Sequence, residues 1–188
     1  LKNKEVLFPY LNGEDLNSRP DCSASRWVID FNDWNEEKAK KYALPYKHLL
    51  KYVKPERQRK KPDGSYQLRK SLPERWWQYG DKRPALRKAI FPMNDVLVIA
   101  LVSKILMPLR VPTGQIFSHA LGVFATSSYA DQAVLSSSIH QYWAISRGSS
   151  LESRLRYTPS DVFETFPRPQ NTDALAAIGK TLDEERRE

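Results

Sequence analysis

The chain has 188 residues, 40% of them hydrophobic, which is enough for one sizeable domain with its own core. A single cysteine excludes an internal disulfide and fits a reducing compartment, so we expect a cytoplasmic protein. No apolar run approaches the roughly 20 residues of a membrane span, so no membrane partner is expected. Because the chain starts at Leu1 without a methionine and ends in a helix-forming run, we expect a piece of a longer protein.

The net charge of +8 is concentrated in one part of the chain. Residues 38–88 hold seventeen basic and four acidic side chains, whereas residues 1–37 hold four basic and eight acidic ones. A positive field of this kind attracts a polyanion, and nucleic acid is the natural candidate. The alternative is a basic face that only keeps the protein in solution.

Taken in chain order, the first segments predict an anchor, a strand, a helix and a basic loop. Residues 1–25 have an apolar start followed by turn residues. Residues 26–31 (RWVIDF) predict a short strand. A helix with Asp33 or Asn35 as cap is expected over about residues 36–41, with an interruption at Pro45 and a second helical stretch to about residue 53. Residues 54–71 are expected to form an exposed, mobile loop that can lie along phosphates.

The next stretch contains a tandem tryptophan pair. The segment ERWWQYG, residues 74–80, predicts a strand in which Trp76 and Trp77 face opposite sides. Packing is the favoured role for both rings, and stacking on a base is the alternative. A helix is expected to begin at Pro84.

The most apolar stretch runs from Asp95 to Ala125. Its β-branched residues predict strands over 96–102 and 116–124. Between them lies SKILMPLR, in which Lys104 and Arg110 interrupt the apolar run. A buried sheet with a cationic, irregular tip is where we place the function. The alternative is a core strand followed by a loop with two solvated charges.

The last third predicts helices and aromatic anchors. One helix is expected over 127–148, with His140 as a packed or capping residue. The extended segment 153–170 carries the anchors Tyr157, Phe163 and Phe166. A polar helix with a narrow apolar face begins near Thr172 and is expected to need a partner from outside the chain. Together the elements predict an α+β class, with helices and long basic loops around one small mixed or antiparallel sheet built from 26–31, 75–79, 96–103 and 116–125.

The residues of known catalytic motifs are missing. The sequence has no glycine-rich nucleotide loop, no GxSxG turn and no CxxC companion for Cys22. Its three histidines lie far apart and its carboxylates are scattered. We therefore predict no catalytic residue and no metal site in this chain, and treat an intact enzyme acting on nucleic acid as an alternative.

Seven strings resemble one family in their order and spacing. They are VLFPYLNGEDLNSRPD, SRWVIDF, YVKPERQR, RWWQYGDKRPALRKAI, VLVIALVSK, SSIHQYWA and YTPSDVFETFPRP. Taken together they resemble the target recognition domain of the MmeI-like (Type IIL) single-chain restriction–modification enzymes. Those enzymes join an endonuclease, an adenine-N6 DNA methyltransferase and a DNA-reading domain in one polypeptide.

The resemblance implies a division of the chain. Residues 1–25 correspond to a linker from an upstream methyltransferase, residues 26–170 to the recognition domain, and residues 171–188 to the start of a helical C-terminal part. The S-adenosylmethionine loop and the Asn-Pro-Pro-Tyr motif of the methyltransferase are missing from this sequence. The resemblance thus implies no cofactor in this piece, S-adenosylmethionine and Mg²⁺ in the parent protein, and double-stranded DNA and the upstream methyltransferase domain as partners.

By position, the resemblance places base reading at Ser103, Lys104, Met107 and Arg110. Physical chemistry favours Lys104 and Arg110, because both can donate hydrogen bonds to guanine O6 and N7 in the major groove. The phosphate-contact candidates are basic residues of the charged block: Lys54, Arg57, Arg59, Lys60, Lys61, Arg69 and Lys70. The predicted function is sequence-specific reading of duplex DNA, and the alternative is a basic protein-interaction or structural module.

Overall fold

The computed structural model describes residues 2–151 and 154–186, and it confirms the α+β class. The chain divides into two compact units. Unit 1 comprises Leu1–Phe8 and Trp27–Arg83, and unit 2 comprises Pro9–Arg26 and Pro84–Glu188. In the part of the chain that the structure describes, no helix combines the length and the apolar character that crossing a membrane requires.

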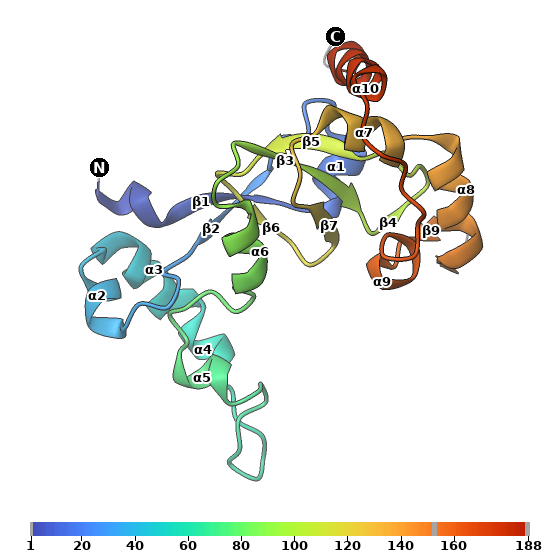
Figure 1. Cartoon of the computed structure of the whole chain (residues 1–188). Coiled ribbons are helices and arrows are strands. Elements are labelled where there is room, and N and C mark those ends of the chain that lie inside the picture. The colour runs from blue at the N-terminus through green and yellow to red at the C-terminus, as the bar shows by residue number, and fades with distance from the viewer. Residues whose placement is uncertain (1, 152–153, 187–188) are drawn as a thin grey trace. The chain divides into compact units, whose positions relative to one another are not determined.

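Unit 1 is mainly helical (Figure 1). Its elements are the 3-10 helix η1 (Lys2–Val6), the start of β1 (Leu7–Leu11), β2 (Arg26–Ile29), α2 (Glu36–Lys40), α3 (Ala43–Tyr52), α4 (Lys54–Arg57) and α5 (Ser71–Glu74). Asn35, one of the two caps that the sequence predicts, caps α2 by accepting a hydrogen bond from the Lys38 amide at 2.9 Å. An aromatic core fills the unit, with Phe31 and Trp76 both buried.

Unit 2 contains most of the strands. Its elements are the end of β1, α1 (Gly13–Ser18), α6 (Pro84–Ile90), β3 (Asp95–Ala100), β4 (Val102–Ser103), β5 (Leu109–Pro112), β6 (Ile116–Phe117), β7 (Leu121–Phe124), α7 (Tyr129–Leu135), α8 (Ser138–Arg147), β8 (Ser149–Leu151), β9 (Arg154–Arg156), α9 (Pro159–Val162) and α10 (Asp173–Glu185).

The predicted core strand is β3, which lies between β5 and β7 in an antiparallel sheet. Val96 and Val98 pack into one apolar cluster, whereas Leu97 and Ile99 pack into another. The two clusters lie on opposite faces of β3, because successive side chains of a strand point to opposite faces, and both clusters are buried. This explains why the segment reads as a continuous apolar run rather than as an alternating one.

The prediction of one sheet is wrong, because the described strands form separate three-stranded groups. In unit 2, β4 and β8 flank β9, and the end of β1 runs parallel to β6. The predicted strand over 116–124 is interrupted after β6, where the Leu121 amide donates to the Ser118 carbonyl at 3.1 Å. The sheet of β3 is thereby completed by β7 alone on that side.

The predicted strand over 74–80 is also wrong. Helix α5 ends at Glu74, and turns carry the tryptophan pair. Trp76 is buried against Tyr46 with ring centroids 5.5 Å apart, and the Trp77 indole donates to the Trp34 carbonyl at 2.9 Å. The structural role favoured for both rings is confirmed. Their strand propensity is overridden because both rings pack within one aromatic core, which an extended chain cannot achieve.

The predicted helix over 127–148 is two helices, α7 and α8. The serine run between them explains the break, since the Ser137 hydroxyl caps α8 by accepting from the His140 amide at 3.2 Å. His140 is fully buried, as predicted for a packed residue. Its ring nitrogens lie 2.7 Å from the Leu135 carbonyl and 3.2 Å from the Tyr157 hydroxyl.

Burial of His140 makes stability depend on pH. Desolvation lowers the pKa of this imidazole in the folded chain, although the Leu135 carbonyl partly opposes the shift. Below about pH 6.5 the unfolded chain therefore takes up a proton that the folded chain resists. We expect the free energy of unfolding to fall from that pH downward, by up to about 1.4 kcal/mol per pH unit.

Urea unfolding between pH 7.5 and 5.5 checks this prediction. A His140→Gln variant should lose part of the pH dependence, whereas His119→Gln, which changes an exposed side chain, should keep it. Identical pH dependence in the parent and in His140→Gln would contradict the assignment.

Helix α10 finds a partner within the chain, on α7 (Figure 1). The two helices approach so closely at Gly179 that a Cβ atom there would lie 1.9 Å from the Tyr129 carbonyl oxygen. The side-chain amide of Gln132 also donates to the Asp183 carboxylate at 3.1 Å. The face of α10 that packs on α7 therefore does not need the predicted partner from outside the chain. Ile178, also on α10, remains 60% exposed.

Candidate nucleic-acid interface

The predicted reading segment divides into an exposed edge and a buried end. After β4 the chain bends at Lys104 and Ile105 and then enters β5 at Leu109. Leu106 is buried and holds the loop to the core, whereas Ile105 is 61% and Met107 40% exposed. The apolar middle of the loop therefore serves both purposes, packing through one side chain and presenting others to solvent.

Ser103, Lys104 and Met107 line one groove of about 500 Å³. The other lining residues are Leu16, Asn17, Ala100, Val102, Ile105, Leu109 and Arg186. Two of the lining residues are cations, Lys104 and Arg186, and none is acidic. The groove thus combines positive charge with an apolar wall, which suits a ligand that carries both negative charge and flat apolar surface.

Helix α1 fixes one wall of the groove. Asn12 and Asp15 form a capping box that sets the start of the helix. Its last turn then places Asn17 beside β4, where the side-chain Oδ1 atom of Asn17 accepts from the Ser103 hydroxyl at 2.9 Å. The Ser103 hydroxyl in turn accepts from the Ile105 amide at 3.3 Å. The sequence predicts a loop at Asn17 and so misses this contact, although the Asn-x-x-Asp pattern of residues 12–15 is a signal for the start of a helix.

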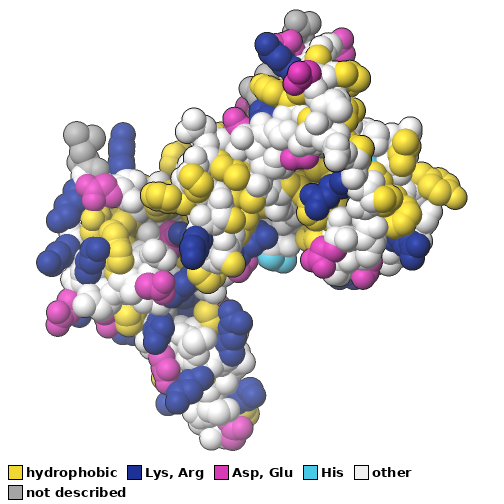
Figure 2. Space-filling model, viewed as in Figure 1, with side chains coloured by type: hydrophobic (Ala, Val, Ile, Leu, Met, Phe, Trp, Pro, Cys, Tyr) yellow, Lys and Arg dark blue, Asp and Glu magenta, His cyan; other side chains and the backbone are white. Residues whose placement is uncertain are grey.

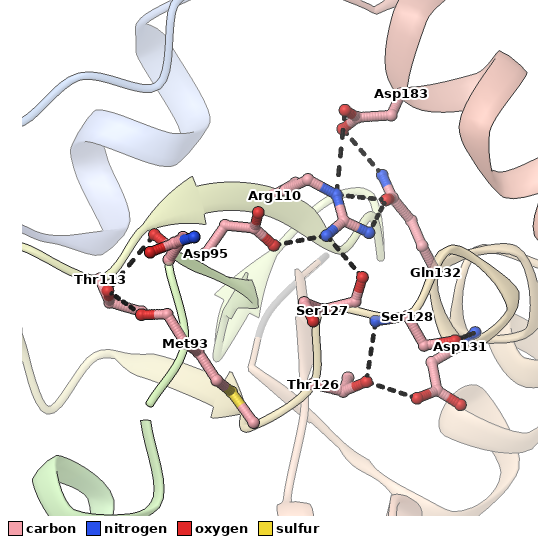
Figure 3. A network of polar contacts seen from close by, with 11 residues as sticks. Met93, Asp95, Arg110, Thr113, Thr126, Ser127, Ser128, Asp131, Gln132 and Asp183 are labelled. Carbon is pink, nitrogen blue, oxygen red and sulfur yellow. Dashed lines mark hydrogen bonds and ion pairs between the residues drawn. The ribbon is translucent and has the colours of Figure 1, made fainter. Parts of the chain in front are cut away.

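Arg110 lies outside the groove, in a polar network (Figure 3). Its side chain is only 4% exposed. One guanidinium nitrogen donates to Asp95 at 2.5 Å and to the Ser127 carbonyl at 2.9 Å. The side-chain Oε1 atom of Gln132 accepts from the other edge at 2.9 Å, and the guanidinium carbon lies 4.1 Å from the centre of the Tyr129 ring.

The same network reaches α10 through Asp183, whose carboxylate lies 3.9 Å from the Arg110 Nε atom. A guanidinium held in this way cannot also present its edge to a guanine, so its placement argues against the predicted base-reading role. The sequence misleads here because Arg110 follows an irregular loop. In the structure it pairs with Leu97 in the middle of the β3–β5 ladder.

Arg57 is likewise engaged inside the protein. Its guanidinium donates to the Trp76 carbonyl at 3.0 Å and to the Gln78 carbonyl at 2.6 Å. Burial lowers its pKa from the usual value. These contacts argue against the predicted phosphate contact and make Arg57 a clamp behind the tryptophan pair. Lys54 lies with its ammonium 5.0 Å from the Trp76 ring centre, so it is also partly committed.

The other phosphate candidates belong to an exposed basic arm, defined here as residues 59–70. All of its residues are exposed, and dark-blue side chains mark its surface in Figure 2. The candidates within it are Arg59, Lys60, Lys61, Arg69 and Lys70. Arg59 pairs with Glu56 and Lys70 with Glu74, but exposed pairs of this kind contribute only about 0–1 kcal/mol. Phosphates can therefore replace these carboxylates.

The arm and the groove belong to different units: the arm to unit 1 and the groove to unit 2. The predicted mobile loop is in part ordered, since Lys60 and Tyr66 face each other in an antiparallel bridge. Across the described ranges 2–151 and 154–186, no cluster of three or more His, Cys, Asp or Glu side chains could hold a metal ion.

Comparison with known proteins gives a structural match. No family model matches the sequence, and no curated protein matches it. The fold is similar to part of the Type IIL restriction–modification enzyme MmeI, whose structure was solved in complex with DNA, with a TM-score of 0.66 and 20% sequence identity. The match covers 98% of this chain and 23% of the MmeI chain, so this chain has the fold of less than a quarter of that enzyme.

Proposed function

We propose that this chain reads a short target site in duplex DNA as part of a restriction–modification protein. The observation that carries the proposal is the cationic groove without carboxylates beside β4, on a fold similar to part of an enzyme solved with DNA. The concentration of basic side chains in residues 38–88 supports the same partner. A target recognition domain is the role that accounts for both features.

In this proposal the groove of unit 2 contacts base edges. Lys104 is the principal donor and reaches guanine O6 or N7. Met107 and its apolar neighbours in the loop provide a surface for a thymine methyl group. The Ser103 hydroxyl donates its proton to Asn17 and accepts from the Ile105 amide, so it offers a base only its remaining lone pair as an acceptor. Arg110 is not included, because its donors are used within the protein.

The end of the basic arm next to α5 supplies affinity without sequence information. Phosphate contacts release counterions, and each contact contributes about −0.9 to the slope of log K against log salt concentration. Arg69 and Lys70 lie at the end of the arm next to α5 and are both exposed. They are therefore suitable positions for testing a contact that is independent of base sequence.

The catalytic parts are proposed to lie elsewhere in the same polypeptide. The neighbour is a restriction–modification enzyme, and the chain matches 23% of it. We propose an adenine-N6 methyltransferase domain as the covalent partner, using S-adenosylmethionine, with Mg²⁺ needed only if the parent protein also cuts DNA. Such a protein works in the cytoplasm, where cellular DNA and S-adenosylmethionine are present.

Binding to duplex DNA at increasing salt concentration tests the proposal. For the unaltered chain we expect tight binding whose log K falls steeply with log salt concentration. The double variant Arg69→Ala/Lys70→Ala should bind every sequence more weakly by about the same factor, and the magnitude of its slope should be smaller by about 1.8. The matched control is Lys4→Ala/Lys180→Ala, which removes two exposed charges outside the arm and outside residues 38–88. Failure to bind any duplex, or equal effects of the two double variants, would contradict the proposal.

A further inference from the structure

The centre of the basic arm is a short β-hairpin. The Gln67 amide donates to the Arg59 carbonyl at 2.9 Å, and the Lys61 amide donates to the Ser65 carbonyl at 2.8 Å. Between these bonds, Lys60 and Tyr66 form the antiparallel bridge. We call residues 59–67 the ribbon. In Figure 1 it extends beyond α4 and α5, the neighbouring helices of unit 1.

The ribbon is ordered by its turn rather than by burial. Every residue in it is exposed, so no apolar core supports it. Gly64 has a φ of +83°, which a side chain would strain, and its amide donates to the Lys61 carbonyl at 3.0 Å. The Asp63 carboxylate accepts from the Ser65 amide at 2.8 Å and from the Ser65 hydroxyl at 2.6 Å. The positive φ of Gly64 and these hydrogen bonds therefore hold the turn in one conformation.

The base of the ribbon is tied to the body of unit 1. The Gln58 side chain donates to the Pro73 carbonyl at 3.1 Å, which joins the segment just before the arm to the segment just after it. Arg57, next to it, is the clamp on the Trp76 and Gln78 carbonyls. Isolated two-stranded hairpins are only marginally stable in water. An exposed ribbon held at its base and shaped by its turn is suited to present a fixed surface to a partner.

The two faces of the ribbon differ. Because side chains alternate along a strand, Lys60 and Tyr66 share one face, with the Lys60 ammonium 5.7 Å from the ring centre. The opposite face carries Arg59, Lys61 and Gln67, together with the Ser65 backbone position opposite Lys61. Arginine and lysine side chains suit guanine O6 and N7, and glutamine suits adenine N6 and N7.

We propose that the ribbon lies in the major groove of duplex DNA, with its Arg59–Lys61–Gln67 face toward the base edges. This inference rests on the proposed DNA-binding function and adds a second contact surface to it. The major groove is about 12 Å wide and admits a two-stranded β-ribbon, whereas the minor groove is only about 6 Å wide. The ribbon lies flat, because entering tip first would push the Asp63 carboxylate among the acceptor atoms of the bases.

Shortening the ribbon tests its position on the DNA. Arg59 and Gln67 are hydrogen-bonded opposite each other, so replacing residues 60–66 by Asn-Gly leaves a two-residue hairpin turn. The probe is a pool of random-sequence duplexes methylated at guanine N7, a major-groove atom. We expect N7 methylation to hinder binding at a set of positions that the shortened variant no longer senses. A minor-groove ligand such as distamycin should not displace the ribbon contacts.

A second variant separates a shaped ribbon from a loose basic tail. Gly64→Val keeps every charge and its Cβ atom would have no neighbouring atom within 4 Å, but it strains the positive φ of the turn. We expect about a five- to 30-fold loss of affinity, because that strain is worth about 1–2 kcal/mol. A tail that only follows phosphates would lose nothing.

The outcomes distinguish this inference from the proposed function. If the unaltered chain binds DNA but the shortened variant keeps every N7 effect, or if Gly64→Val binds as tightly as the parent, the ribbon is not in the major groove. If the unaltered chain binds no duplex, the proposed function fails instead.

Discussion

Replacing Arg110 by alanine is expected to lower the free energy of unfolding by about 3–5 kcal/mol. The side chain is 4% exposed and joins Asp95 of β3, Gln132 of α7 and Asp183 of α10. Truncation removes a positive charge that lies 3.9 Å from the Asp183 carboxylate, which is only 8% exposed and keeps its hydrogen bond from the Gln132 side chain. Removing one member of a buried charge pair costs more than the net contribution of the pair.

Urea or thermal unfolding of the purified chain measures the effect. Arg110→Lys should be intermediate, because lysine keeps the charge but cannot reproduce the two-edged contacts with Asp95 and Gln132. Lys180→Ala, on the exposed surface of α10, is the matched control and should change stability by less than about 0.5 kcal/mol. An Arg110→Ala protein that is as stable as the parent and loses choice at one base pair would show that Arg110 reads DNA after all.

Replacing Lys104 by alanine is expected to relax sequence choice at one base pair. Lys104 is exposed and lines the groove beside β4, and its ammonium can donate to guanine. A specific base contact of this kind discriminates by about 1–3 kcal/mol, which corresponds to about a five- to 150-fold preference. Stability should hardly change, because the side chain lies on the surface.

Competition between duplexes that differ at one base pair measures this preference. Lys180→Ala again serves as the control, since it removes the same charge from the same unit without touching the groove. The Lys104→Ala and Arg69→Ala/Lys70→Ala variants should differ in kind, because the first changes preference and the second changes overall affinity and its salt dependence. Similar behaviour of the two would show that base reading and phosphate contact are not divided in this way.

Local sequence signals predict the elements whose structure is decided locally. The β-branched run Val96–Val102 indicates the central strand, and Asn35 indicates the start of α2. The strand predicted for the tryptophan pair is wrong because the conformation of this segment depends on Trp34 and Tyr46, which lie far away in the sequence. Sequence alone does not say which distant side chains will enclose a ring.

The candidate site shows the same division. The exposed positions Lys104 and Met107 follow from an irregular loop between strands, and the structure places them in one groove. The burial of Arg110 could not be predicted, because it depends on Asp95, Gln132 and Asp183 from three different elements. Arg57 is a similar case, since two backbone carbonyls more than fifteen residues away accept its hydrogen bonds.

The most direct test of DNA reading by the groove is selection from a pool of random duplexes, performed in parallel with the unaltered chain and with Lys104→Ala. The unaltered chain is predicted to enrich one short sequence, and the variant to enrich the same sequence with one base pair left open. Enrichment of no sequence by the unaltered chain, or of an identical sequence by both proteins, would contradict the account.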